Sequence, residues 1–569
     1  MGTTIQQWEE AGASLVTALT KYLDLSLLLE QNALLEDNSG KDLAMRIDSA
    51  LSSLQTVVDS HMSRVRSALA RTRNRILSPI HRLPREVLSG IFMNAIFAAP
   101  DLSKPEPVED SVARIYLTLH NILGVCEKWR DIALTQGSFW SIVPVLDFPS
   151  RTRAGKIKQA NAVLLRSILR ANLKGHLHLV VAQPCDSSYI EVLGALAVSF
   201  RAANISAGSR SSLRRTLDIF LSQGFPEDLA LSQLSIHQKQ DDSYLYKLPK
   251  VKNYVLSNNS PEQAVFEKLS QNLSSLRIRG AQFHWARFSF ANRLTELYLQ
   301  EVLFGHELGH FFQAIASASE LRVLELVSIV SFYDGPPVYT TPEQSEIHLS
   351  NLQTLVIKDL YFNTLDQILC SITSRSHSLS LFLTEKCRYA DTAGLDSDFV
   401  DVHWESLYEL LRQVQVKDLL LTNNVTDHWL PSSRMEELLK STISGLQTLQ
   451  LHLWDFSTAY CNVLTSYSLS DDSLSCKISN LHITCARVHD RGAFTDMVLS
   501  HSNSIRKMVF GGLIRSVRGD SFDRVLDHES VVFIMKSSVR KFQLYEVTKF
   551  KNVDRAPTPQ VTGDELISN

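Results

Sequence analysis

The stretch Leu294-Thr295-Glu296-Leu297-Tyr298-Leu299 carries the pattern that decides the fold, with apolar residues at its first, fourth and sixth positions. Its second half alternates apolar and polar side chains, which predicts a short strand with Leu297 and Leu299 on one buried face. The pattern returns along the chain, and the spacings between the starts of copies include 21, 27, 30 and 31 residues. The other copies are Leu231/Leu234/Ile236, Leu273/Leu276/Ile278, Leu321/Leu324/Leu326, Leu352/Leu355/Ile357, Val416/Leu419/Leu421, Leu446/Leu449/Leu451, Ile478/Leu481/Ile483, Ile505/Met508/Phe510, Val539/Phe542/Leu544 and the degenerate Leu379/Leu381/Leu383.

Stretches with the apolar periodicity of helices separate these copies, as at residues 405–414 and 435–443. One short strand and one helix cannot bury an apolar face alone, so such units must stack on each other. The array resembles the leucine-rich repeats, although its spacing is irregular. We therefore expect an α/β solenoid over residues 146–550, followed by a polar, disordered tail at 551–569.

The length and composition indicate a folded protein of several units. A chain of 569 residues exceeds one ordinary core, and 44% hydrophobic with 21% charged residues is typical of a folded soluble chain. The 57 basic and 60 acidic residues leave a net charge of −3, which argues against a generally basic nucleic-acid-binding protein.

The cysteines point to a reducing compartment. Seven of them occur in the whole chain and no two form a CxxC pair, so neither a zinc finger nor a thioredoxin-like site is indicated. We expect reduced, mostly buried thiols in a cytoplasmic and/or nuclear protein, with no cofactor and no metal.

Residues 1–77 are predicted to be helical, and apolar residues with heptad spacing occur in their second half. A short coiled coil that dimerises the chain and a helix that packs on its own neighbour both fit this spacing. The residues with this spacing are Ile47, Leu51, Leu54, Val58, His61, Val65 and Ala68.

The same region holds a basic segment. Residues 64–85 contain seven arginines and no acid before Glu86, which fits a nuclear-import or nucleic-acid patch or, with no aromatic residues interleaved, a solvated helix face. Glu9 and Glu10 replace the basic start of a signal peptide. The apolar stretch 23–29 is far shorter than the roughly 20 residues that span a bilayer, so we expect no membrane contact.

Three short motifs between residues 79 and 142 resemble the F-box family. They are residues 83–92 (LPREVLSGIF), residues 125–133 (VCEKWRDIA) and residues 139–142 (FWSI). The layout, with a leucine-rich array behind these motifs, is similar to F-box-like proteins expanded in fungi. The predicted architecture is an N-terminal helical segment at 1–77, a three-helix F-box at 78–145 and then the repeats.

The resemblance implies a non-enzymatic function. The F-box would dock a Skp-type adaptor of a Skp–cullin–F-box ubiquitin ligase, and the repeats would bind a protein substrate for ubiquitin-dependent degradation. The segment 98–111 is longer than the family's usual link, which leaves open whether the adaptor binds. The implied adaptor-binding residues are Leu83, Pro84, Val87, Leu88, Ile91, Phe92, Val125 and Trp129.

Polar residues between the apolar strand positions are the candidate substrate contacts, because they face away from the buried side of each strand. Their chemistry is mixed, so the class of substrate cannot be inferred from the sequence. These candidates are Tyr298, Glu325, Lys358, Gln450, His482 and Gln543.

Two other functions fit parts of the sequence. A repeat scaffold that binds a partner without a ubiquitin role needs only the array. A zinc hydrolase is suggested by His306-Glu307-Leu308-Gly309-His310, which matches HExxH. We expect this stretch to be a helix between two repeats, with both histidines facing solvent. Gln313 and Ala316 stand where metzincins carry Gly and His.

Overall fold

The computed structural model describes residues 2–32, 40–77, 79–98, 108–145, 177–182, 187–222, 230–239, 254–332, 347–372, 377–391, 399–423, 428–442, 445–469, 478–502, 504–515, 522–524 and 541–544. The chain forms two compact units, Met1–Ile91 and Phe92–Asn569. The predicted tail at 551–569 and most of the segment 98–111 lie outside the described residues.

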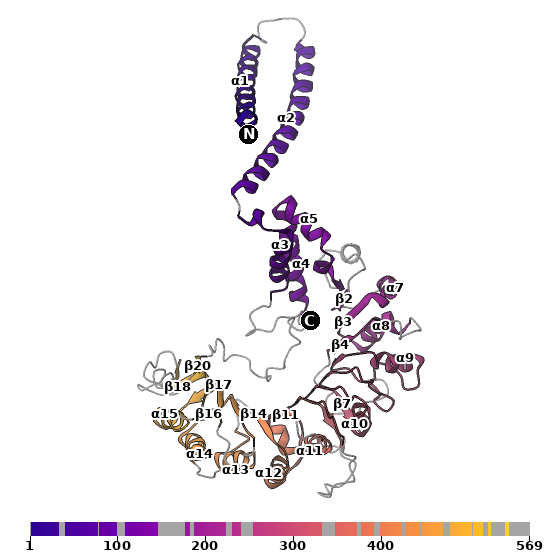
Figure 1. The fold of residues 1–569 in the computed structure, drawn as a ribbon, viewed down its shortest axis with the longest axis vertical. Coiled ribbons are helices and arrows are strands. Elements are labelled where there is room, and N and C mark those ends of the chain that lie inside the picture. Colours follow the sequence, from indigo (N-terminus) through magenta and orange to yellow (C-terminus); the bar gives the residue numbers. More distant parts are fainter. Residues whose placement is uncertain are drawn as a thin grey trace. The chain divides into compact units, whose positions relative to one another are not determined.

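The first unit is helical (Figure 1). It contains α1 (Gly2–Asn32), α2 (Gly40–Leu77), the short 3₁₀ helix η1 (Pro79–Arg82) and the start of α3 (Arg85–Ile96). Helix α2 ends at Leu77, two residues before Pro79, which cannot continue a helix because it lacks the backbone N–H. The helical region predicted over residues 1–77 therefore ends where its sequence indicates.

Helix α1 is the part of the described chain that bears on the expectation of no membrane contact. It is a continuous helix of 31 residues that is long and apolar enough, by length and composition, to cross a membrane, and none of its residues is buried. The stretch 23–29, considered alone, was too short, but the apolar residues before it extend the helix.

The second unit is built on one long parallel sheet, so the predicted α/β class is confirmed at this level. Sixteen strands of the described residues belong to the sheet, and β19 alone pairs antiparallel to its neighbour. Strand β16 (Asp455–Phe456) also pairs with β17, and β20 (Lys541–Leu544) with β18. In spatial order the others are β1 (Ile142–Val145), β2 (Leu177–Val181), β3 (Phe200–Ala207), β4 (Gln233–Gln238), β5 (Ser275–Arg279), β6 (Glu296–Gln300), β8 (Val323–Val327), β10 (Thr354–Lys358), β11 (Ser378–Leu383), β14 (Val416–Thr422), β15 (Thr448–His452), β17 (Asn480–Val488), β18 (Lys507–Arg515) and β19 (Phe522–Arg524).

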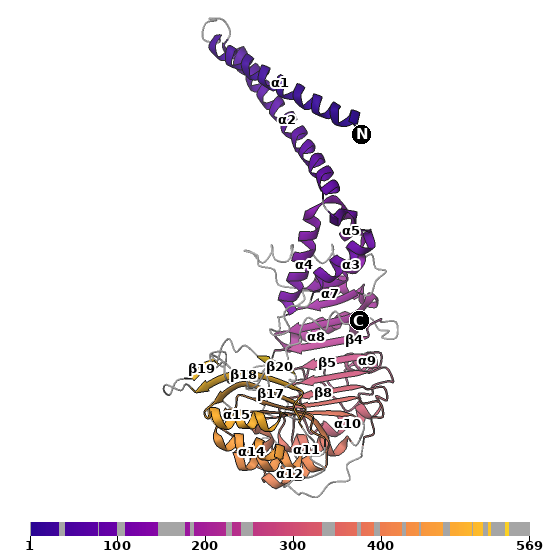
Figure 2. The ribbon, with the colours of Figure 1, turned by 60° about the vertical axis from the view of Figure 1, so that its left-hand side comes forward.

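The described helices connect successive strands and pack on one face of this sheet, and the other face carries none of them (Figures 1 and 2). Small strand pairs flank the sheet: β7 (Leu303–Gly305) with β9 (Val330–Ser331), and β12 (Tyr389–Asp391) with β13 (Phe399–Asp401). The helices are α4 (Val108–Val125), α5 (Glu127–Thr135), α7 (Ser187–Gly194), α8 (Arg210–Leu221), α9 (Pro261–Ser270), α10 (Leu308–Ala316), α11 (Phe362–Ser371), α12 (Trp404–Arg412), α13 (Ser432–Ser441), α14 (Thr458–Leu469) and α15 (Arg491–Ser500), with 3₁₀ turns η2 (Gly137–Trp140), η3 (Ala197–Ser199) and η7 (Glu385–Arg388).

Each of the eleven sequence copies contributes a strand to this sheet. Their apolar residues lie opposite one another in neighbouring strands, as Leu297 opposite Leu324 and Leu299 opposite Leu326. From Leu234 of β4 to Phe510 of β18 these side chains are buried, so the stacked strands share one continuous core. The sheet also begins before the predicted array, because β1 pairs in parallel with β2.

The degenerate copy marks a shift in register. On one side Leu379 and Leu381 of β11 lie opposite Leu355 and Ile357 of β10. On its other side β11 places Leu381 and Leu383 opposite Leu419 and Leu421 of β14. Because β11 has three alternating leucines, its first two match β10 and its last two match β14. The apolar pattern of the repeats after β11 is therefore displaced by two residues along the sheet relative to the repeats before it.

Several strands end in a residue with left-handed backbone. Gly280 (φ 69°), Glu301 (φ 55°), Ser328 (φ 47°) and Asp359 (φ 58°) follow β5, β6, β8 and β10 directly. This conformation turns the chain sharply away from the sheet and is unfavourable for residues other than glycine. The recurrence of this strained turn places a polar side chain at the same edge of three consecutive strands.

We expect Gly512→Ala to destabilise the end of the sheet by about 1–3 kcal/mol, because the strands there have no room for a side chain. A Cβ at Gly512 would lie 2.4 Å from the carbonyl oxygen of Ala486, where the β17–β18 register shifts. Urea unfolding of the full chain measures the effect. The control is Gly309→Ala on α10, where nothing lies within 4 Å, and it should leave stability unchanged or slightly higher. Equal stability of both variants would contradict the close packing at Gly512.

Candidate functional site

Helix α3 carries two apolar stripes, of which the fold buries one. Leu88 and Phe92 are 0% and 2% exposed, whereas Val87 and Ile91 are 45% and 42% exposed. Both pairs are four residues apart, so each pair forms a row along the helix. The exposed row of Val87 and Ile91 is apolar surface that the core of the chain does not use.

The start of this helix has the geometry expected from Leu83-Pro84. The carbonyl of Pro84 accepts the first helical hydrogen bond, from the N–H of Leu88 at 3.1 Å. Proline is tolerated here because no N–H is needed at the start of a helix. Pro84 is exposed and Leu83 is half-buried, so both can contribute to a surface next to Val87.

The second unit holds the other two predicted adaptor contacts. Val125 is 54% exposed at the end of α4. Trp129 of α5 is half-buried, and its ring centroid lies 4.7 Å from that of Phe92. The buried Trp140 donates from Nε1 to the carbonyl oxygen of Ala133 at 2.8 Å, which ties η2 to α5.

The predicted adaptor contacts therefore need one correction. Leu88 and Phe92 point into the interior, because they occupy the buried row of α3, and they cannot contact a partner in this conformation. The residues that stay at least partly accessible are Leu83, Pro84, Val87, Ile91, Val125 and Trp129.

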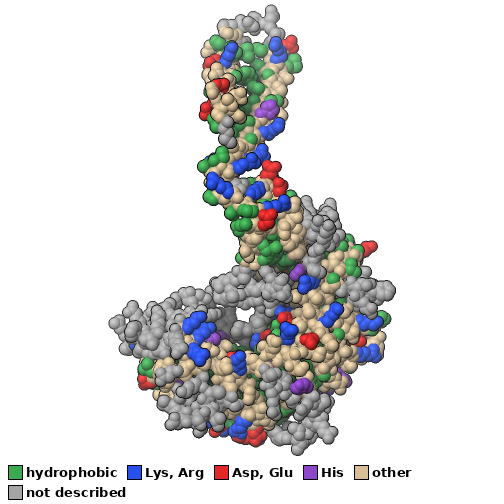
Figure 3. All heavy atoms as spheres, viewed as in Figure 1, with side chains coloured by type: hydrophobic (Ala, Val, Ile, Leu, Met, Phe, Trp, Pro, Cys, Tyr) green, Lys and Arg blue, Asp and Glu red, His purple; other side chains and the backbone are tan. Residues whose placement is uncertain are grey.

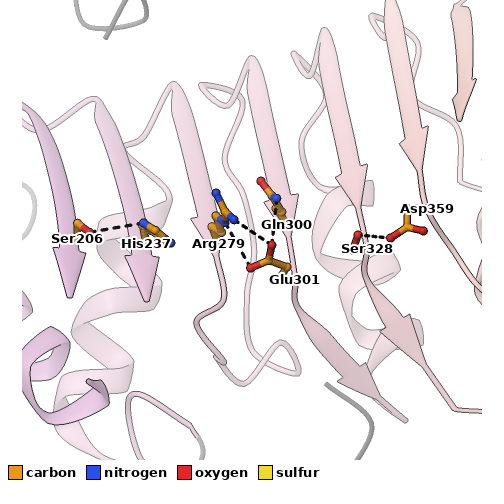
Figure 4. A network of polar contacts seen from close by, with 7 residues as sticks. All are labelled: Ser206, His237, Arg279, Gln300, Glu301, Ser328 and Asp359. Carbon is orange, nitrogen blue, oxygen red and sulfur yellow. Dashed lines mark hydrogen bonds and ion pairs between the residues drawn. The ribbon is translucent and has the colours of Figure 1, made fainter. Parts of the chain in front are cut away.

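The face of the sheet opposite the described helices, called the helix-free face below, is the second candidate surface (Figures 1 and 2). In its first half, charged side chains form ion pairs between neighbouring strands (Figure 4). Arg279 donates to both carboxylate oxygens of Glu301 at 3.3 and 3.1 Å, and Gln300 donates to the same carboxylate at 3.2 Å. Asp359 accepts from Ser328 at 2.6 Å. It also accepts from Lys386 at 2.7 Å.

The structure brings three predicted substrate contacts together. Tyr298 lies opposite Glu325 in the neighbouring strand, and Glu325 accepts a hydrogen bond from Lys358 Nζ at 2.6 Å. The guanidinium of Arg277 lies over the ring of Tyr298 at 4.1 Å, and burial raises the pKa of the Tyr298 hydroxyl. This group presents an aromatic edge and a paired charge side by side, which suits recognition of a protein surface.

The other three candidates lie beyond the register shift. Gln450 and His482 are opposite each other in β15 and β17. Burial, with a smaller contribution from Lys507, lowers the pKa of His482. Gln543 lies opposite Val509 in β20, and its side chain is outside the described part of the chain.

Sequence reasoning missed the charged residues at the strand ends. They are Arg279 at the end of β5, Glu301 and Asp359 directly after β6 and β10, and beside them Arg277 within β5 and Lys386 in η7. Their signal is positional, since Arg279 directly follows the last apolar residue of its copy, and Glu301 and Asp359 come two residues after theirs. The ion pairs between them depend on register, which the sequence does not give.

The HExxH stretch agrees with the prediction in the exposure of His306 and His310 and differs from it in where the helix begins. Helix α10 begins at Leu308, so His306 precedes the helix and does not share it with His310. The Glu307 carboxylate accepts from the Tyr254 hydroxyl at 3.1 Å and from the backbone N–H of Trp285 at 2.9 Å. No three His, Cys, Asp or Glu side chains among the described residues are grouped to hold a metal ion. This geometry gives the hydrolase hypothesis no support.

We expect acid to weaken the sheet partly through His237. Burial, and then the charge of Arg279, lower the pKa of His237 to about 4. In the unfolded chain the pKa of this histidine is near 6.5, so as the pH falls the unfolded chain binds the proton before the folded chain does. The contribution of neutral His237 to the free energy of unfolding is therefore fully present above pH 6.5 and is lost as the pH falls toward 4. Unfolding measured across this range should show a smaller loss for His237→Gln than for the native chain. The exposed His310→Gln should behave as the native chain, and an unchanged slope in His237→Gln would contradict the assignment.

The comparisons with known proteins add little to this geometry. Neither the protein-family models nor the curated proteins contain a match to the chain. Among solved structures, a crystal structure described as the Rad7 and Elc1 complex in yeast is similar with a TM-score of 0.33 and 11% sequence identity. The alignment covers 84% of this chain and 94% of that chain. At so low a TM-score the similarity carries no argument about function.

Proposed function

We propose that the chain is the substrate-recognition subunit of a Skp–cullin–F-box ubiquitin ligase and has no enzymatic activity of its own. The segment around α3 docks a Skp-type adaptor, and the leucine-rich sheet binds the target protein. One observation carries the proposal: the F-box-like motif of residues 83–92 places Val87 and Ile91 in an exposed apolar row.

The energetics favour a protein partner for this row. The side chains of Val87 and Ile91 remain 45% and 42% exposed. Burying the rest of each side chain against a partner would contribute about 1 kcal/mol to the free energy of binding. Apolar anchors surrounded by polar residues dominate protein interfaces. The row is flanked by exposed Arg85 and Glu86, which would form the polar rim.

The proposal places the protein in the cytoplasm and/or the nucleus. It is supported by the described cysteines, which are all free thiols: Cys126, Cys370, Cys387, Cys461 and Cys485. Burial raises the pKa of the Cys370 thiol to about 11, which makes it poorly reactive. The function needs no cofactor, because the adaptor and target are bound through side chains alone.

The decisive experiment is capture of a purified Skp-type adaptor by the full chain. Val87→Glu/Ile91→Glu should weaken binding about 100-fold, because two apolar anchors of an interface are replaced by charges. The matched control is Val192→Glu/Leu499→Glu, which changes a valine and a leucine of similar exposure, 39% and 46%, on α7 and α15. This control should bind as the native chain does.

The outcomes separate the two protein-binding functions. A native chain that binds no Skp-type adaptor would overturn the ligase proposal and leave a repeat scaffold. Equal binding by both double variants would show that the adaptor contact lies elsewhere than on α3. Because Val87 and Ile91 are exposed in the chain, their replacement should leave the unfolding transition in place.

Target binding should depend on the sheet and not on α3. We expect Tyr298→Ala/Lys358→Ala to lose the co-purified target proteins, because it removes an aromatic contact and a charge from the helix-free face. The same variant should retain the adaptor. Mass spectrometry of co-purified proteins measures both, and loss of the same targets from Val192→Glu/Leu499→Glu would contradict this assignment of the target surface.

A further inference from the structure

We propose that α1 and α2 form the interface between two copies of this chain, joined in a helical bundle. Helix α1 has no buried residue, and its large apolar side chains are between 42% and 64% exposed. Figure 3 shows hydrophobic side chains along both N-terminal helices. The exposed apolar residues of α1 are Ile5, Trp8, Leu15, Val16, Leu19, Tyr22, Leu23, Leu25, Leu27, Leu28 and Leu29.

Both helices carry an apolar seam with heptad spacing. In α1, steps of three and four join Ile5, Trp8, Leu15, Leu19, Tyr22 and Leu29, with Gly12 and Ser26 at the two remaining seam positions. In α2 the seam includes Leu51, Leu54 and Val65, which are 55%, 38% and 44% exposed. Seams of this period exist to pack against another helix. The α1 seam is exposed along its length, and Ile47 and Val58 of the α2 seam are only half-buried, so a single copy leaves most of both seams uncovered.

The charges of the two helices are complementary. Helix α1 has four acids, Glu9, Glu10, Asp24 and Glu30, against Lys21 alone. Residues 61–77 of α2 hold five arginines and no acid. Pairing α2 with α2 of the second copy along these residues would oppose like charges, whereas α1 beside α2 of the second copy joins opposite charges.

The flanking positions repeat this complementarity. Glu9 and Glu30 directly follow the seam residues Trp8 and Leu29, and Arg64 directly precedes the seam residue Val65. Charges beside a coiled-coil seam set the choice and orientation of the partner helix. The structure therefore points to a bundle of four helices in which α1 contacts α2 of the other copy.

A lipid bilayer is the other possible occupant, and it fits less well. Lys21 and Asp24 lie within the most apolar part of α1, and each charge near the centre of a bilayer costs about 2.5–3.5 kcal/mol on insertion scales. A membrane-spanning helix also needs no heptad seam. A second copy accounts for the seam and leaves both charges in water at its outer side.

The test uses the full chain and two matched variants of α1. Leu15→Glu/Leu19→Glu changes seam positions that are both 43% exposed. Leu27→Glu/Leu28→Glu removes two leucines, 48% and 51% exposed, from outside the seam. All four side chains are exposed within one copy, so neither variant should alter its folding.

Light scattering coupled to size exclusion should give the native chain twice its 64.0 kDa mass. Leu15→Glu/Leu19→Glu should give a monomer, and Leu27→Glu/Leu28→Glu should stay dimeric. A monomeric native chain at micromolar concentration would overturn the proposal. The proposal would also be overturned if the native chain floated with phosphatidylcholine vesicles and neither variant did. Insertion into a bilayer would depend on all four leucines equally, whereas a dimer depends on the two seam leucines. Adaptor capture by the monomeric variant keeps this test separate from the proposed function.

Discussion

The structure depends on the alignment of apolar side chains across neighbouring parallel strands. A strand of five residues with a single helix buries too little apolar surface to hold its own shape, so each unit is stable only between two others. Leucine opposite leucine, as at Leu297 and Leu324, fixes the register, because a slip of one residue would turn the apolar side chains to solvent. The backbone hydrogen bonds of the sheet and its continuous core both follow from that constraint.

The polar face of the sheet is a consequence of the same alternation. Every second residue of a strand faces away from the core, so a row of polar side chains crosses the strands wherever the apolar rows are in register. In the first half these side chains neutralise one another, as Lys358 with Glu325 and Arg279 with Glu301. These side chains are only 19–30% exposed, so the cost of removing the charges from water offsets much of their attraction. Their value is a surface of defined shape on which a partner can be recognised.

The N-terminal helices leave apolar surface exposed that the core does not need. A short helix such as α3 needs one buried row to stay in place, and Leu88 and Phe92 provide it. The row of Val87 and Ile91 exceeds that need, as do the seams of α1 and α2. Apolar surface that the core does not use is concentrated in the first quarter of the chain, while the sheet presents polar groups, so the two regions suit different partners.

The local sequence by itself determined where the regular elements lie and where they end. It determined the strand in each repeat, the helices between the strands, the end of α2 before Pro79 and the start of α3 after Pro84. These follow from interactions between residues near each other in the chain. The tertiary structure decided which partner each residue meets. It buried Leu88 and Phe92 where contacts were expected, shifted the register at β11, started α10 after His306, and paired Arg279 with Glu301. Those outcomes depend on strands and helices brought together from distant parts of the chain, and a pattern read along one segment does not contain them.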